Sequence, residues 1–293
     1  MQNFDIQNAA YVGRIETGID SILPDELARP VIIHEAMRYS MQAGGKRLRP
    51  VLVLAAADMA GASCDALPAA VAVECLHAYS LIHDDMPCVD NSDLRRGRPT
   101  SHVRFGEAMA LLAGDALLTE AFRIIGTAYA DSPALGMKLL GVLSDAASSQ
   151  RLIGGQVEDI LGEQLDISPS DLDFIHLNKT AALISASLEM GLLHANPKPT
   201  ELDAIRRAGR ALGLAFQIVD DVLDATADAA TLGKTAGSDA DLGKNTYVKF
   251  FGVEASRKRA VELGEEAAQA LSTWGKDAEF LLTLTRGLAL RLK

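Results

Sequence analysis

The chain has 293 residues, of which 48% are hydrophobic and 23% are charged, as in an ordinary folded globular protein. Its formal net charge of −11 argues against a nucleic-acid partner, because a duplex-binding protein normally carries a basic face. Aromatic residues make up only 5% of the chain, while Ala and Leu are abundant. This balance predicts packed helices rather than sheets.

The cysteines and the N-terminus indicate a compartment. Cys64, Cys75 and Cys88 form no CxxC pair and are odd in number, which is typical of free thiols in a reducing environment. The N-terminus lacks a basic stretch followed by an apolar one, and no run of about 18 apolar residues occurs. We therefore expect no signal peptide, no membrane span and a cytoplasmic location.

Helical periodicity begins early in the chain. A helix is predicted over 31–41, with Gly44 and Gly45 as its stop signal. Pro50 fits the first turn of the next helix. The stretch from 68 to about 83 is apolar almost all round, which is typical of a buried helix.

The pattern continues to the C-terminus. Ser170 and Thr200, each followed by acidic residues, are predicted N-caps. Two long polar stretches, 86–102 and 227–245, interrupt the helices, and loops of this length are usually functional or disordered. No linker is visible, so a single domain over 1–293 is expected. Further helices are predicted over 106–130, 134–161, 170–194, 200–225 and 253–274, with a last one ending near Lys293.

Each polar stretch follows an apolar helix that ends in carboxylates. The second of these motifs, DDxxD, places Asp220, Asp221 and Asp224 near one helix face, because residues four apart lie about 40° apart around a helix. Carboxylates so placed repel one another, and a bound divalent cation removes the repulsion. All-oxygen ligands suit magnesium, so the motif predicts a Mg²⁺ site.

The first motif, DDMPCVD at 84–90, does not fit one helix face, since Asp90 would lie about 240° around from Asp84. Pro87 clashes with the carbonyl of His83 and interrupts the helix, so the chain can bulge and bring Asp90 back beside Asp84. One acidic run is usually a solvated helix face, but two at the ends of apolar helices favour metal binding. His83 is interpreted as a packed histidine, because carboxylates suffice for magnesium.

Basic residues gather in short segments, and arginine and lysine side chains match phosphate oxygens. An acidic protein that binds a polyanion must concentrate its cations in this way or recruit metal. The sequence GKT at 233–235 is not a Walker A loop, because Asp228 stands where the first glycine belongs. His34-Glu35 does not begin an HExxH motif, because position 38 is Arg.

Taken together, the acidic motifs, the basic segments and several further motifs occur in an order that resembles the trans-prenyltransferases, and within them the bacterial farnesyl diphosphate synthases. The resemblance implies an all-α, isoprenoid-synthase-type helical bundle around a deep central cavity, usually a homodimer, with three Mg²⁺ ions per active site. The motifs are GGKRLRP at 44–50, ECLHAYSLIHDDMPCVDNSDLRRGRPTSH at 74–102, GDALLTEAF at 114–122, GGQ at 154–156, NKT at 178–180, FQIVDDVLD at 216–224 and GKTAGSDADLGKNTY at 233–247.

The resemblance also implies roles for individual residues. The metals would be held by Asp84, Asp90, Asp220 and Asp224, with Asp85, Asp221 and Lys179 joining them in catalysis. Isopentenyl diphosphate would be bound by Lys46, Arg49, His77 and Arg96. The allylic diphosphate would be bound by Arg95, Lys179, Thr180, Gln217, Lys234 and Lys244. Asn91 stands where relatives often have another acid, which could lower metal affinity.

The implied reaction joins isopentenyl diphosphate to dimethylallyl or geranyl diphosphate. Metals and basic side chains stabilise the departing diphosphate, and a dry aliphatic cavity keeps water from the allylic carbocation. The alkene then attacks, and a proton is lost to the released diphosphate. In this family a bulky residue near Tyr79 and Ser80 forms the cavity floor. With Tyr79 in that role growth would stop at the C15 product, farnesyl diphosphate, and the alternative is that Tyr79 is ordinary core.

Other functions stay open at this point. The main product could be geranylgeranyl diphosphate (C20) or a C10 chain. A class I terpene cyclase or a head-to-head condensing enzyme also ionises diphosphates, but the paired motifs with GGKRLRP upstream argue against both. A non-catalytic synthase subunit or a scaffold protein would be expected to have lost carboxylates or basic ligands, and here all are present.

Overall fold

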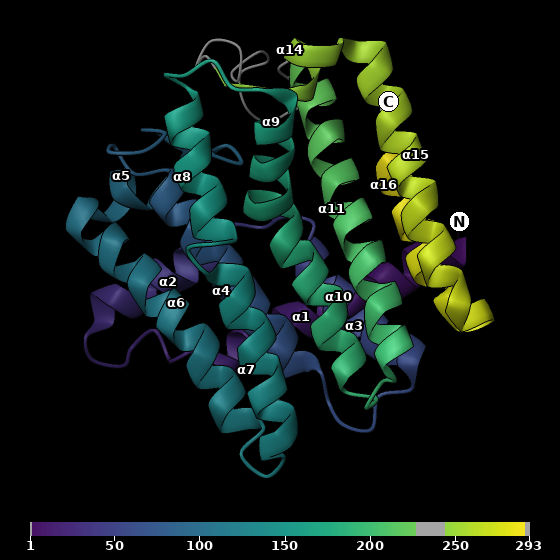
Figure 1. Cartoon of the computed structure of the whole chain (residues 1–293). Coiled ribbons are helices and arrows are strands. Elements are labelled where there is room, and N and C mark those ends of the chain that lie inside the picture. The colour runs from purple at the N-terminus through teal and green to yellow at the C-terminus, as the bar shows by residue number, and fades with distance from the viewer. Residues whose placement is uncertain (1, 227–243, 291–293) are drawn as a thin grey trace. The chain divides into compact units, whose positions relative to one another are not determined.

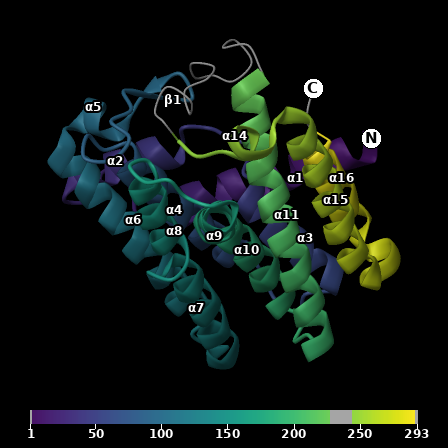
Figure 2. The same ribbon diagram turned by 45° about the horizontal axis from the view of Figure 1, so that its top comes forward.

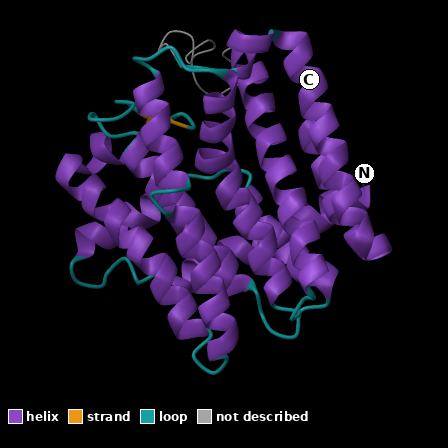
Figure 3. Ribbon diagram, viewed as in Figure 1, coloured by secondary structure: helices purple, strands orange, loops and turns teal. Residues whose placement is uncertain are grey.

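The computed structural model describes residues 2–226 and 244–290, and these are built almost entirely of helices (Figures 1 and 3). The all-α prediction is confirmed, with one addition, a small antiparallel hairpin of β1 (Leu94–Arg95) and β2 (Arg98–Pro99). The segments η1 and η2 are a π-helix and a 3₁₀-helix. The helices are α1 (Gln2–Ile22), α2 (Val31–Met41), α3 (Leu48–Ala60), α4 (Leu67–Asp84), α5 (Ser101–Phe105), α6 (Glu107–Ala128), α7 (Pro133–Ala147), α8 (Leu152–Gly162), α9 (Pro169–Ile175), η1 (His176–Ala181), α10 (Ala182–Leu193), α11 (Pro199–Thr226), α14 (Tyr247–Phe251), α15 (Val253–Leu271), η2 (Ser272–Ala278) and α16 (Glu279–Ala289).

One predicted helix needs correction, and one helix was not predicted. The helix predicted over 134–161 is wrong, because the chain leaves the helical path after α7 and α8 starts only at Leu152. Ser148 supplies a physical reason, since its hydroxyl accepts a hydrogen bond from the N–H of Gln150 at 3.3 Å and offers the backbone an alternative to the helix. Helix α1 is an addition that no pattern above predicts.

The two predicted N-caps are also misplaced. Ser168, not Ser170, caps α9, in a capping box with Asp171. The Ser168 hydroxyl accepts from the Asp171 N–H at 3.3 Å, and the Asp171 carboxylate accepts from the Ser168 N–H at 2.8 Å. Thr200 lies inside α11, because Pro199 already occupies the first helical position.

Contacts divide the chain into two compact units. Unit 1 comprises Met1–Leu54 and Asp65–Leu140, and unit 2 comprises Ala55–Cys64 and Gly141–Lys293. The prediction of a single domain over 1–293 stays a prediction.

Unit 1 is organised around α4. This helix packs along α6 and also contacts α1 and α2 (Figure 1). Cys75 and Leu76, near its middle, are completely buried, as the apolar sequence predicts. The burial fixes α4 in place and so positions Asp84 at its C-terminal end.

Unit 2 is organised around α11, which packs against α10 and α15 (Figure 2). Helix α10 is buried on nearly every side, which explains its almost uniformly apolar sequence. None of the described helices, in either unit, is long and apolar enough to cross a bilayer.

One close approach within unit 2 requires glycine. A Cβ atom placed on Gly155 of α8 would lie 2.3 Å from the backbone nitrogen of Lys179 in η1. Because backbone cannot swing aside as a flexible side chain can, any larger residue at 155 must push α8 and η1 apart. The glycine therefore sets the spacing between these two segments.

We expect Gly155→Ala to lower the free energy of unfolding by about 1–3 kcal/mol, the usual range for an overpacked contact. The matched control is Gly141→Ala, which changes an exposed position within α7 where a new Cβ would meet nothing within 4 Å. That variant should gain up to about 1 kcal/mol from helix propensity. Urea unfolding of both proteins measures the difference, and equal effects would show that the contact with Lys179 is not tight.

Candidate active site

The first acidic motif closes on itself at the end of α4. The helix ends at Asp84, and the N–H of Asp90 donates to the carbonyl oxygen of Asp84 at 2.9 Å. The main chain therefore brings Asp90 back beside Asp84, as the position of Pro87 predicts. Both aspartates are half-buried.

The middle carboxylate of this motif is held by the protein itself. Asp85 is 4% exposed and accepts two hydrogen bonds from Arg95, at 2.7 Å from Nε and 2.8 Å from Nη2. Burial raises the pKa of the Asp85 carboxyl, and Asp90 adds to the rise, while Arg95 opposes it. This bidentate pair ties β1 to the end of α4, in the geometry that arginine makes best.

The cations predicted for isopentenyl diphosphate converge within unit 1. The Arg96 guanidinium donates to the carbonyl oxygen of Gly44, two residues before the exposed Lys46. Arg49 Nη1 lies 3.4 Å from His77 Nε2. Burial, followed by the charges of Arg49 and Arg96, holds the pKa of His77 well below its ordinary value. His77 is therefore neutral near pH 7, and the positive charge of the cluster comes from its arginines and lysine.

Arg47 is a site residue that the sequence analysis missed. It is 4% exposed, in a left-handed backbone conformation with φ of 49°, between the two cations Lys46 and Arg49. Its Nε lies 2.7 Å from a carboxylate oxygen of Glu16, and its Nη1 lies 2.8 Å from Glu74. Burial alone would lower the pKa of Arg47, but the two carboxylates raise it. One signal was present in the sequence: Glu74 lies within the otherwise apolar stretch that forms α4. A carboxylate buried there needs a partner.

The predicted chain-length residues lie on α4, against α6. Tyr79 is 5% exposed, and its ring meets the His83 ring edge-on, with centroids 5.3 Å apart. His83 Nε2 lies 3.1 Å from the carbonyl oxygen of Leu111 in α6, so this histidine packs between the helices. Burial, followed by Asp84, raises the pKa of Tyr79. The hydroxyl of Ser80 donates to its own helix, to the His77 carbonyl at 2.9 Å.

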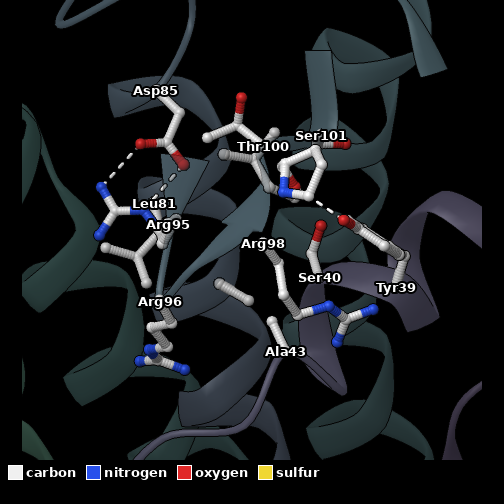
Figure 4. Close-up of a pocket in the computed structure, with 13 residues that line it drawn as sticks. Tyr39, Ser40, Ala43, Leu81, Asp85, Arg95, Arg96, Arg98, Thr100 and Ser101 are labelled. Carbon is white, nitrogen blue, oxygen red and sulfur yellow. Dashed lines mark hydrogen bonds and ion pairs between the residues drawn. The ribbon is translucent and has the colours of Figure 1, made fainter. Parts of the chain in front are cut away.

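A pocket in unit 1 lies beside the Asp85–Arg95 pair (Figure 4). Tyr39 of α2 forms one side, where its hydroxyl donates to the Pro99 carbonyl at 2.7 Å and its ring lies 4.5 Å from the Arg98 guanidinium carbon. The pocket is lined within unit 1 alone. The deep central cavity stays a prediction.

In the second acidic motif, in unit 2, the middle aspartate is again held by groups of the protein. Asp221 is 3% exposed, and its Oδ1 accepts from Gln217 Nε2 at 2.9 Å. Its Oδ2 accepts from the backbone N–H of Tyr247 at 2.8 Å. The Thr180 hydroxyl donates to the side-chain amide oxygen Oε1 of Gln217 at 2.8 Å, so three predicted site residues form one hydrogen-bonded chain.

Lys179 extends from the π-helix η1 toward α8. Its Nζ lies 2.5 Å from Asp159 Oδ2, an ion pair whose two side chains are 25% and 14% exposed. Asp159 was missed in the sequence, although it lies four residues after Gly155 and thus on the same face of α8. Single π-turns inside helices often occur at functional sites.

The remaining predicted ligands divide between described and undescribed parts. Asp220 is half-buried and Asp224 is 5% exposed on α11. Lys244 is the first residue of the second described range, 244–290, and the next residue, Asn245, donates to the Gly162 carbonyl at 2.7 Å. The role predicted for Lys234 lies outside the described residues.

The donor set fits magnesium. Over residues 2–226 and 244–290, no three His, Cys, Asp or Glu side chains lie close enough to enclose an ion. Magnesium does not require such a cage, because it is usually held by one or two carboxylates together with substrate phosphates and water. Asp84 with Asp90, and Asp220 with Asp224, supply carboxylates of this kind in each unit.

The fold is all-α, and its paired acidic motifs and clustered arginines and lysines are the donor types that suit magnesium and phosphate oxygens. The chain matches the family model described as polyprenyl synthetase over residues 30–276. It therefore belongs to the polyprenyl synthetase family, whose prenyltransferases depend on magnesium.

Individual relatives agree with this assignment. The chain is 46% identical over 285 residues to the heterodimeric geranylgeranyl pyrophosphate synthase large subunit 1, chloroplastic, of Arabidopsis thaliana, covering 94% of this chain and 76% of the relative. A crystal structure of an FPP/GFPP synthase from Zymomonas mobilis is 34% identical with a TM-score of 0.87, covering 98% and 99% of the two chains. A geranyltransferase from Helicobacter pylori, complexed with magnesium and isoprenyl diphosphate, is 33% identical with a TM-score of 0.82, covering 98% and 97%. The isoprenoid-synthase fold is thereby confirmed, and so is the membership of the family, while the finer prediction of a bacterial farnesyl diphosphate synthase is not confirmed.

We expect Arg47→Met to lower the free energy of unfolding by about 3–5 kcal/mol, because it leaves the carboxylate of Glu74 buried without its cation. Arg207→Met, at an exposed position on α11, is the control and should change stability by no more than about 0.5 kcal/mol. Thermal and urea unfolding compare the two. Similar losses in both variants would contradict the structural role of Arg47.

Proposed function

We propose that this prenyl-diphosphate synthase joins isopentenyl diphosphate to a short allylic diphosphate, with geranylgeranyl diphosphate (C20) as its main product. The observation that carries the condensation is the hydrogen bond from the Arg96 guanidinium to the carbonyl oxygen of Gly44, which brings Arg96 to the loop before Lys46. Both cations belong to the same unit as the first acidic motif. Clustered cations of this kind bind diphosphates. The C20 length is supported by the Arabidopsis relative, which is named a geranylgeranyl pyrophosphate synthase.

In the proposed mechanism Lys46, Arg49 and Arg96 bind the diphosphate of isopentenyl diphosphate. Lys179 and Thr180 bind the allylic diphosphate and stabilise the charge that develops on its leaving oxygen. Magnesium would be held by carboxylates of the two motifs and would supply further neutralisation of that charge. These carboxylates are Asp84 and Asp90 in the first motif and Asp220 and Asp224 in the second.

The other features of unit 1 support the same chemistry. His77, being neutral, adds no positive charge to the cluster of Lys46, Arg49 and Arg96. The carbocation must be kept from water, which a dry aliphatic cavity would do. Three magnesium ions per site, a homodimer and a cytoplasmic location stay predictions.

Farnesyl diphosphate (C15) is the second candidate product. It is favoured by Tyr79, a bulky side chain buried where α4 packs on α6, five residues before Asp84. If the growing chain descends along α4 from Asp84, the Tyr79 ring would stop it. The two candidates thus differ in whether Tyr79 faces the growing chain.

The product assay tests the proposal directly. Purified protein receives isopentenyl diphosphate with dimethylallyl or geranyl diphosphate, with and without Mg²⁺, and the dephosphorylated products are separated by chromatography. We expect magnesium-dependent C20 alcohol. C15 alcohol would overturn the product length but keep the condensation, and no product with either allylic substrate would overturn both.

Tyr79→Ala tests the floor role separately. If Tyr79 stops growth, removing its ring should shift the main product by at least one C5 unit, because the cavity deepens at that point. Tyr79→Phe keeps the ring and should leave chain length unchanged. Identical product lengths in wild type and Tyr79→Ala would assign the residue to the core.

A further inference from the structure

Tyr247 connects three separate elements of unit 2. It is the first residue of α14 and is 6% exposed. Its backbone N–H donates to Asp221 on α11, its ring stacks on His176 of η1, and its hydroxyl donates to Asp173 of α9. None of the functions assigned above uses this residue.

The contact with Asp221 completes a chain of hydrogen bonds. One carboxylate oxygen accepts from the side-chain amide N–H of Gln217, whose amide oxygen Oε1 accepts from the Thr180 hydroxyl. The other carboxylate oxygen accepts from the N–H of Tyr247. A buried carboxylate needs such donors on both oxygens, because an unsatisfied charge in the interior is costly. The orientation of Asp221 therefore depends on where the Tyr247 backbone lies.

The contact with His176 is one of packing. The His176 and Tyr247 rings lie 5.5 Å apart at an interplanar angle of 23°. His176 is 5% exposed, its Nε2 is 3.7 Å from Asp221, beyond hydrogen-bond range, and its Nδ1 meets no hydrogen-bond partner among the described residues. Hydrogen bonds of its own therefore do not fix this ring, so its orientation depends on packing, of which the stack with Tyr247 is a part.

His176 is also the first residue of the π-helix η1, which carries Lys179 and Thr180. A π-turn is less regular than an α-turn and depends on its surroundings to persist. Gly155 supports η1 from the side of α8, and the Tyr247 ring supports its start.

We propose that Tyr247 is a positioning residue for the reaction, which orients Asp221 through its N–H and holds η1, with Lys179 and Thr180, through its ring. The inference rests on the proposed function, in which these residues serve the allylic diphosphate. In this proposal Tyr247 acts through other side chains and makes no substrate contact. The residues proposed for isopentenyl diphosphate belong to unit 1, so losing the Tyr247 ring should affect one substrate selectively.

The test compares two variants with a control. Tyr247→Leu keeps an apolar side chain but removes the stack, and Tyr247→Phe keeps the stack and loses only the hydrogen bond to Asp173. Tyr129→Phe is the matched control, because that tyrosine is 6% exposed and its hydroxyl donates to the Asp65 carbonyl at 2.9 Å in unit 1.

For Tyr247→Leu we expect the KM for geranyl diphosphate to rise about tenfold while the KM for isopentenyl diphosphate changes less than about twofold. Tyr247→Phe and Tyr129→Phe should stay within about twofold of wild type for both substrates. Equal rises for both substrates in Tyr247→Leu, or no rise for either, would overturn the proposal.

Calorimetric titration with inorganic diphosphate and Mg²⁺ gives a readout that needs no turnover. Tyr247→Leu should bind this probe about tenfold more weakly than wild type, and Tyr247→Phe should bind it normally. If wild type forms no prenyl product, the proposed function fails, yet the titration still decides the role of Tyr247.

A second variant is available if Tyr247→Leu does not fold. His176→Gln removes the same stack, and unchanged diphosphate affinity in that variant would refute the role.

Discussion

Adjacent carboxylates at the end of a buried helix repel each other, and the rest of the site depends on how that repulsion is relieved. In both acidic motifs the second aspartate of the pair is buried and satisfied by the protein. Asp85 receives the fork of Arg95, and Asp221 receives Gln217 and the backbone of Tyr247. The two units thus solve the same electrostatic problem in the same way, with different donors.

This solution also attaches the chain that follows each motif. Arg95 belongs to the hairpin after the first motif, and Tyr247 begins α14, which is the first described helix after the second. A single carboxylate therefore does two things at each site: it closes a long polar connection and it stands next to an aspartate proposed to bind metal. Replacing Asp85 or Asp221 would disturb folding and chemistry together, so activity alone could not tell these roles apart.

The sequence allowed much of the fold to be predicted where one strong signal dominated. Helix α2 matches its predicted bounds of 31–41, and the apolar run from 68 onward became the buried α4. The prediction was wrong where the signal was weak, as at Ser148, where a side chain competes with the helix for the backbone. The π-helix η1 could not be predicted, because apolar spacing separates helix from strand but not one kind of helical turn from another.

The site shows the same division. The return of Asp90 to Asp84 followed from Pro87 alone, since its effect on a helix is local and steric. The partners of buried charges were missed, because Glu16 and Glu74 are far from Arg47 in sequence and meet it only through the packing of α1 and α4. Pairings of this kind depend on tertiary structure, which no short motif encodes.

The π-turn at 176–181 has a consequence for how this sequence is compared with others. A π-turn bonds residue i to i+5 and so accommodates one residue more than an α-turn of the same height. A relative that keeps an ordinary α-helix there would need one residue fewer, and η1 joins α9 and α10 directly, so the difference falls inside the helix. An alignment that moves this gap into the connection before α9 or after α10 would pair Lys179 with the wrong position, although every helix would still match.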